Sequence, residues 1–225
     1  MNPSNPEIDP GSQDGQLTTA RDETEESCLS GGPGWKHYEK RDATNGDRAV
    51  GITACLTSES IKGGTGTDKN IRLPGYQWAQ KEAWKTGRKS WDAINNCHLL
   101  GKGLGGSGTD LDNLSTCSRE ANADSMDNSP NLARNMDYYE DLARKAVTID
   151  KQAVYYTVTP KYAGGRTVPY GYQMTARGVN RDGSPGLKFD DIVYNEMYDR
   201  KRKWAFNLGY RLDGDLKPVP VGGTP

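Results

Sequence analysis

The sequence predicts an α+β domain in which an antiparallel sheet is flanked by a few helices and joined to one long glycine-rich loop. Several short segments alternate apolar and polar residues, as Val154, Tyr156 and Val158 do, which is typical of strands with one buried face. One segment repeats apolar residues at helical spacing up to Thr148. The glycines at 101, 103, 105, 106 and 108 exclude a long helix or a regular strand in that stretch.

The first half of the chain holds one expected strand, one loop and one short helix. Apolar side chains alternate with their neighbours over 48–56, which predicts a strand. Glycine, threonine and lysine dominate residues 62–70, which are expected to form a loop. A short helix is expected over 77–85 and carries Trp78 and Trp84.

Residues 97–117 form the most unusual segment, because glycines and leucines alternate in it between two cysteines. We expect an ordered loop whose leucines anchor it to the core; a long ordered loop is usually functional. The anchoring residues are Leu99, Leu100, Leu104, Leu111 and Leu114.

The second half is expected to hold one helix and three strands. Ser129 and Pro130 are typical of a helix start, and the apolar stripe that follows ends near Thr148. The expected strands are 154–160, 171–177 and 187–195, the last two separated by a turn at 182–186.

Composition limits the class of protein. The chain has 225 residues, of which 33% are hydrophobic and 26% charged, enough for one ordinary domain. No apolar run approaches the roughly 18 residues of a membrane span, and no charged-then-apolar leader opens the chain. Collagen, coiled coil, integral membrane protein and fully disordered chain are therefore excluded, and no membrane partner is expected.

The charges are unevenly placed. Residues 1–27 hold seven acids and one base, whereas the remainder holds 28 bases and 23 acids, a net charge of +5. A mildly basic body is compatible with a polyanionic partner, although a solvated surface has the same composition. We expect a flexible acidic leader at 1–34, one domain at 35–215 and a tail at 216–225.

Four cysteines and two histidines argue for disulfides rather than zinc. Cysteines 28, 55, 97 and 117 include no Cys-x-x-Cys pair, so a structural zinc site is not expected. Of the three possible connectivities, we favour the sequence-nearest pairs, Cys28–Cys55 and Cys97–Cys117. The second pair would close a 20-residue loop, worth about 3 kcal/mol in the chain-entropy model. Two disulfides indicate an oxidising compartment.

The chemistry that remains centres on His98. The chain has no Walker loop, no Rossmann fingerprint and no Gly-x-Ser-x-Gly elbow. With just two histidines in the chain, a two-histidine acid–base ribonuclease mechanism is hard to build. Phosphodiester hydrolysis needs a base for water and a cation for the phosphate charge. A neutral imidazole supplies the base, and Mg²⁺ accepts one or two protein oxygens, so an Asn amide can suffice.

The run from Cys97 to Gly101, the glycine loop, Asn113-Leu114 and a helix bearing Glu140 resemble the DNA/RNA non-specific endonuclease family. The resemblance covers roughly 48–177 and continues through the strand that ends in Thr-Pro-Lys-Tyr at 159–162. It implies a ββα-metal nuclease fold, with the glycine segment as the catalytic loop. It also implies a secreted or toxin-associated enzyme that acts on DNA and, we expect, RNA.

The resemblance implies roles for individual residues. His98 matches the general base, and Asn122 matches the metal ligand, with Asn128 as its rival. Arg119 is a candidate phosphate clamp, and Glu140 is expected to orient the waters of Mg²⁺, for which Mn²⁺ is the alternative.

Many members of the family read Asp-Arg-Gly-His, whereas this chain reads Asn95-Asn96-Cys97-His98. The missing arginine has four candidate replacements. Asn113 is a further substrate-binding candidate, although for this residue we expect above all side-chain hydrogen bonds that brace the loop. The four replacements are Arg88, Lys89, Lys102 and Arg119.

The sequence favours hydrolysis that leaves 5′ phosphates. The alternative is a nuclease-like domain that binds nucleic acid or a surface partner without cutting it. A toxin module held by an immunity protein is a third hypothesis, and the oligomeric state stays open. Trp78, Trp84 and Trp91 could stack on bases, and Lys201 to Lys203 could touch phosphates, although core packing and a solvated charge run are the more common roles.

Overall fold

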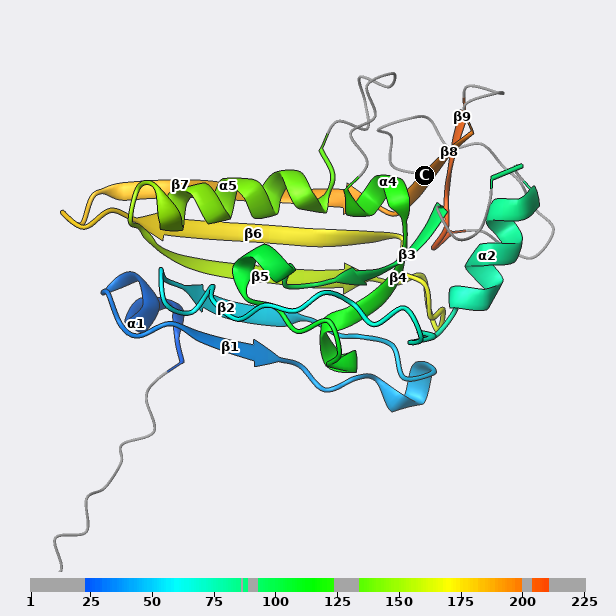
Figure 1. Ribbon diagram of the computed structural model, residues 1–225, viewed down its shortest axis with the longest axis horizontal. Coiled ribbons are helices and arrows are strands. Elements are labelled where there is room, and N and C mark those ends of the chain that lie inside the picture. Colours follow the sequence, from blue (N-terminus) through cyan, green and yellow to red (C-terminus); the bar gives the residue numbers. More distant parts are fainter. Residues whose placement is uncertain (1–22, 86, 89–92, 124–133, 200–203, 211–225) are drawn as a thin grey trace, which may run out of the picture.

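The computed structural model describes residues 23–85, 87–88, 93–123, 134–199 and 204–210 (Figure 1). Its main feature is a five-stranded antiparallel sheet with the order β1-β2-β5-β6-β7. The strands are β1 Trp35–Tyr38, β2 Ile52–Leu56, β5 Ala153–Lys161, β6 Gly171–Val179 and β7 Pro185–Tyr194. The α+β prediction and the four expected strands are confirmed. The sequence analysis missed β1, whose four residues are too few to establish an alternating pattern.

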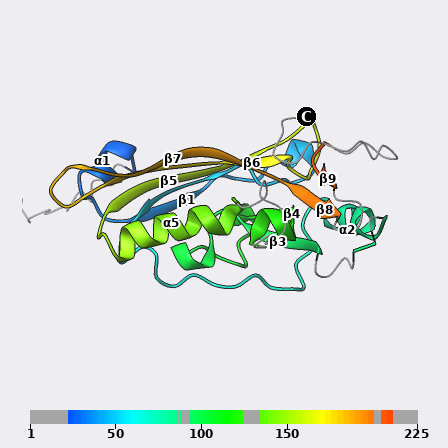
Figure 2. The ribbon, with the colours of Figure 1, turned by 90° about the horizontal axis from the view of Figure 1, so that it is seen from above.

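One face of this sheet carries the core. Helix α5 (Met136–Thr148) and the small sheet of β3 (Ile94–His98) and β4 (Leu114–Ser118) cover it, as Figure 2 shows from above. Side chains of β2, β5 and β6 pack there against those of α5. Fully buried residues of this cluster include Ile52, Leu56, Leu99, Leu100, Leu104, Met136, Tyr156 and Met174.

The opposite face holds a helix that the sequence analysis did not expect. Helix α1 (Glu25–Leu29) contacts β5 and β6 and lies across the sheet from α5 (Figure 2). A capping box between Thr24 and Ser27 starts it, and Cys28 bonds to Cys55 of β2. The expectation of a flexible leader up to residue 34 is therefore wrong for this helix, because the cap and the disulfide fix it to the sheet.

Helices α2 and α5 agree with the expectations, except at the first residue of α5. Helix α2 (Tyr76–Lys85) confirms the prediction over 77–85. Helix α5 ends at Thr148 as expected, but it begins at Met136, because the side chain of Asn135 caps it by accepting from Tyr138 N. The expected start at Ser129-Pro130 lies outside the described residues.

Several short elements complete the described chain. Helix α4 (Arg119–Asn122) follows β4 directly, and β8 (Glu196–Asp199) pairs with β9 (Trp204–Asn207). Three 3-10 turns are η1 Ala43–Asn45, η2 Lys102–Leu104 and η3 Leu111–Asn113. No helix within the described ranges is both long and apolar enough to span a bilayer.

The glycine segment is shorter than predicted, because strands β3 and β4 occupy its two ends. The loop proper is 99–113, which we call the glycine loop, and residues 62–70, the covering segment, lie against it. Thr65 N donates to the Gly106 carbonyl at 3.0 Å and Asp68 N to that of Gly108 at 3.3 Å. A side chain at Gly106 would overlap the Leu100 carbonyl, which explains why glycine is needed there.

Both expected disulfides are confirmed. Cys28–Cys55 has a Cα–Cα separation of 5.5 Å, and Cys97–Cys117 one of 5.9 Å. All four cysteines are buried. The second bond ties β3 to β4 just before His98 and just before the start of α4, so it fixes the frame of the glycine loop.

We predict that Leu104→Ala lowers the free energy of unfolding by about 2–5 kcal/mol, because Leu104 is fully buried and anchors the glycine loop to the core. Urea unfolding of the oxidised protein measures the change. Ile149→Ala is the matched control, since Ile149 is 69% exposed and its loss should cost under about 0.5 kcal/mol. Equal effects of the two substitutions would contradict the anchoring role.

Candidate active site

His98, Arg119 and Asn122 come from one strand–loop–strand–helix unit, β3 to α4, whereas Glu140 lies on α5. Strands β3 and β4 pair antiparallel, with Asn95 opposite Cys117 and His98 opposite Leu114. The side chain of Ser118 at the end of β4 accepts from Ala121 N at 3.0 Å, which starts α4 without an intervening loop. The unit thus has ββα order.

His98 ends β3 beneath the covering segment. Its Nε2 lies 3.0 Å from the Thr65 carbonyl oxygen, and its Nδ1 lies 3.4 Å from the Thr67 hydroxyl. Because a carbonyl only accepts, Nε2 carries the proton in the neutral ring. Nδ1 then holds the free lone pair and faces the Thr67 hydroxyl.

The surroundings of His98 keep it neutral. Burial lowers its pKa below the ordinary 6.5; Lys102 also lowers it, while the bond to Thr65 acts in the opposite direction. An imidazole with a lowered pKa is unprotonated at neutral pH and can therefore accept a proton.

Asn95, Asn122 and Arg119 form a second group of contacts. Asn122 Nδ2 donates to Asn95 Oδ1 at 2.9 Å, and Arg119 Nη1 approaches the same oxygen at 3.5 Å. Arg119 can only donate, so Asn95 must present its oxygen to it, and Asn122 must then present its NH₂ group. Among the described residues, no hydrogen bond then reaches the Asn122 carboxamide oxygen, so it can take another partner.

The structure does not join these two groups directly. Successive side chains of a strand point to opposite faces, so Asn95 and His98 lie on different faces of β3. Among the described residues, no hydrogen bond links His98 to Asn122, Arg119 or Glu140.

Glu140 lies on α5 with its carboxyl group against Gly101, three residues after His98. A side chain at Gly101 would overlap that carboxyl group. Burial raises the pKa of Glu140 to about 8, and the neighbouring charges of Asp137 and Asp141 add to the shift. The position is one where a cation would favour the ionised carboxylate.

Two predicted substrate-binding residues have structural partners instead. Asn113 is fully buried, and its amide bonds to Leu100 N (2.8 Å), the Leu100 carbonyl (3.1 Å) and the Ser107 carbonyl (2.9 Å). It braces the glycine loop and leaves no surface for substrate. Arg88 pairs with the buried carboxylate of Glu120 on α4, so it is not a free phosphate ligand.

Of the remaining candidate site residues, some are exposed and others lie outside the residues that the structure describes. Lys102 and Arg119 are exposed, Lys102 close enough to His98 to affect its pKa. Lys89 and Asn128 lie outside the described residues, as do Trp91 and Lys201 to Lys203.

Sequence reasoning missed Thr65, Thr67 and Asn95 as contacts of the predicted site. Thr65 acts through a backbone carbonyl, which no side-chain pattern reveals. Asn95 was noticed only as a departure from the family motif, although its place in that motif was the available signal.

The donor set suits a hard divalent cation. Within the described ranges, no cluster of three or more His, Cys, Asp or Glu residues could hold a metal. A cation that keeps most of its waters needs no such cluster, because one oriented amide oxygen can suffice. The free oxygen of Asn122 fits this requirement.

The ββα order of β3, β4 and α4 and the antiparallel sheet agree with the expected ββα-metal nuclease fold. A family model described as DNA/RNA non-specific endonuclease matches residues 30–180, more than half of the chain. The chain therefore belongs to the DNA/RNA non-specific endonuclease family, and the protein is an endonuclease.

Solved structures of nucleases share the fold. A structure of the nuclease Sda1 with a bound zinc ion has a TM-score of 0.52 at 19% identity, covering 72% of this chain and 76% of that one. An extracellular nuclease has a TM-score of 0.50 at 17% identity, covering 72% and 85%. No curated protein matches the chain.

Proposed function

We propose that this endonuclease uses His98 as its general base and requires a divalent metal, cutting DNA and RNA without sequence preference and leaving 5′ phosphates. The observation that carries the proposal is the orientation of His98 between the Thr65 carbonyl and the Thr67 hydroxyl. Membership of the family supports a nucleic-acid substrate.

His98 accepts the proton of the attacking water at Nδ1, because the Thr65 carbonyl keeps the proton of the neutral ring on Nε2. Once protonated, the ring still donates through Nε2 to that carbonyl, which stabilises the imidazolium. The covering segment therefore both orients the base and supports its charged form.

Mg²⁺, with Mn²⁺ as the alternative, would supply positive charge to the phosphate and the leaving oxygen when bound. The Asn122 carboxamide oxygen would hold it, with Asn95 fixing the amide orientation. Glu140 would orient its waters. The zinc ion in the Sda1 structure supports a metal requirement here.

Lys102 and Arg119 are the exposed cations that would bind substrate phosphate. Arg119 lies beside Asn122 through their shared contact with Asn95, whereas Lys102 lies beside His98. Two buried disulfides and the extracellular neighbour support secretion. An immunity protein stays a prediction.

His98→Ala should lower the rate of plasmid nicking in Mg²⁺ by about 10²–10⁴-fold, because it removes the base. The matched control is His37→Ala, which changes the other histidine, exposed on β1. Far-UV circular dichroism checks that both variants fold. Cleavage by His98→Ala at the wild-type rate would refute the base assignment.

The cleavage rate should fall with decreasing pH through an apparent pKa below 6.5, since only the neutral ring accepts a proton. Lys102→Gln removes a positive charge that disfavours protonation, so it should move this acid limb to higher pH. Proton NMR titration of the His98 ring measures the pKa independently of turnover. A limb that stays in place in Lys102→Gln, or moves to lower pH, would contradict this electrostatic account.

Asn122→Ala should abolish chelator-sensitive cleavage, and Asn95→Leu should weaken Mn²⁺ binding by about 10–100-fold, because the Asn122 amide loses its orienting partner. Calorimetric titration with Mn²⁺ measures binding without relying on activity. Asn70→Ala, at an exposed position, is the control. Unchanged Mn²⁺ affinity in Asn122→Ala would show that the metal ligand lies elsewhere.

A further inference from the structure

A pocket separate from His98 lies between the start of α2 and the turn that follows β5. Its volume is about 260 Å³, and its lining consists of Gly75, Trp78, Gly165, Arg166, Thr167 and Val168. The described residues of this lining supply an indole ring, a guanidinium and a hydroxyl, and none of them is acidic. Such a combination suits a flat aromatic group next to an anion.

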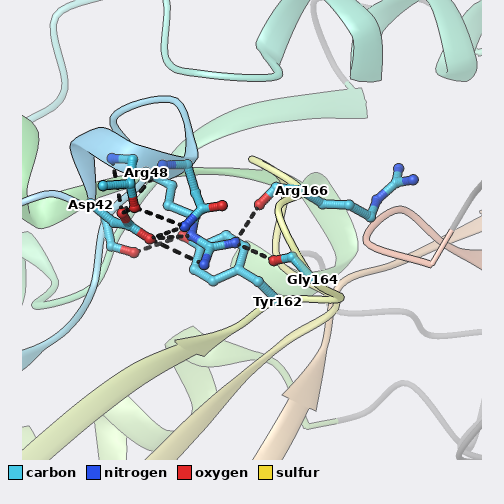
Figure 3. A network of polar contacts seen from close by, with 8 residues as sticks. Asp42, Arg48, Tyr162, Gly164 and Arg166 are labelled. Carbon is cyan, nitrogen blue, oxygen red and sulfur yellow. Dashed lines mark hydrogen bonds and ion pairs between the residues drawn. The ribbon is translucent and has the colours of Figure 1, made fainter.

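The turn after β5, which carries Arg166, is held in place by hydrogen bonds from Arg48. Arg48 Nη1 donates to the carbonyl oxygens of Gly164 at 2.6 Å and of Arg166 at 2.8 Å. Arg48 is in turn paired with Asp42 at 3.1 Å and lies over the Tyr162 ring at 4.3 Å. Figure 3 shows this network, from which the side chain of Arg166 extends away.

Arg166 and Trp78 meet across the pocket. The guanidinium carbon of Arg166 lies 5.0 Å from the centre of the Trp78 ring, within the range of a cation–π contact. Gly75 has a φ of +76°, and a side chain there would collide with Val168 and Thr167. Glycine at position 75 therefore lets α2 approach the turn closely. Contacts within the protein thus hold both sides of the pocket, α2 and the turn after β5.

The pocket is connected to the candidate active site through β3. The Tyr76 hydroxyl donates to the carbonyl of Ile94, the first residue of β3, at 3.3 Å. Ile94 lies four residues before His98, or about 13 Å along a strand.

Cations lie between the two places. Lys69, near the end of the covering segment, and Arg72, on the stretch that leads from it to α2, are both exposed. Arg72 lies 5.5 Å from the centre of the Tyr76 ring. Asn96, between Ile94 and His98 on β3, donates to the Ile71 carbonyl at 3.0 Å and so fixes this stretch along the strand.

We propose that the Trp78–Arg166 pocket is a second substrate-binding site, which stacks one base of a single-stranded nucleic acid on Trp78 and places the adjoining phosphate on Arg166. This proposal rests on the proposed function only in that the same strand is cut at His98. Stacking on an aromatic ring tolerates any base, so the site adds affinity without sequence preference.

The test measures binding of a fluorescein-labelled single-stranded DNA of about twelve nucleotides, a length within the site sizes of single-strand binding proteins. Fluorescence anisotropy is read in the full-length His98→Ala protein with chelator present. Trp78→Ala should raise Kd about tenfold, and Trp78→Phe should raise it less because it keeps an aromatic face. Trp84→Ala is the matched control, since Trp84 is 67% exposed on the same helix but does not line the pocket.

Arg166→Gln keeps the backbone carbonyl that Arg48 binds, so it provides a second route if Trp78→Ala fails to fold. It should weaken binding and reduce the dependence of Kd on salt by about one phosphate contact. In the cleaving enzyme, both variants should raise KM for the long strand and leave kcat unchanged, with no effect on a dinucleotide. If the wild-type protein did not cleave the strand, that result would contradict the proposed function alone, because the Kd values are measured without cleavage. Equal Kd values for Trp78→Ala, Arg166→Gln and Trp84→Ala would overturn the pocket proposal.

Discussion

The contact between the covering segment and the glycine loop is the constraint on which the candidate site depends. The covering segment has no helix or strand and the glycine loop has only the 3-10 turns η2 and η3, so backbone bonds between the two, such as Thr65 N to Gly106 O, help to order both. The two backbones can approach this closely because glycine occupies position 108, where a side chain would overlap the Gly66 carbonyl, and position 64, where one would overlap the Lys102 carbonyl. The same contact brings the Thr65 carbonyl to His98, so loop packing and the state of the imidazole are set together.

Pattern and motif were enough to predict four of the five strands of the sheet, α2, the end of α5, both disulfides and the segment that carries His98. They failed where stability comes from contacts distant in sequence. Helix α1 is held by a disulfide to β2, and β3 has a polar sequence that shows no alternation but pairs with β4. Asn113 was expected above all to brace the loop, with substrate binding as a second role, and its full burial, which leaves only the bracing role, could be known only from the packed loop.

The replacement of the family's acidic residue by Asn95 changes the electrostatics near Asn122. A carboxylate there would offer a full negative charge to Arg119, whereas the amide offers one neutral oxygen to two donors. The neutral residue leaves more of the positive charge of Arg119 available to a phosphate. It still dictates which way the Asn122 amide faces, so the change preserves orientation while altering charge.

The bond between Cys28 and Cys55 spans β1 and the turns that lead to β2. Lys40, whose side chain is 92% exposed, lies inside this covalent ring. A protease that cuts once after Lys40 would break the backbone but release no fragment, because the sulfur bridge still joins the two pieces. The nicked enzyme would keep α1 attached to the sheet.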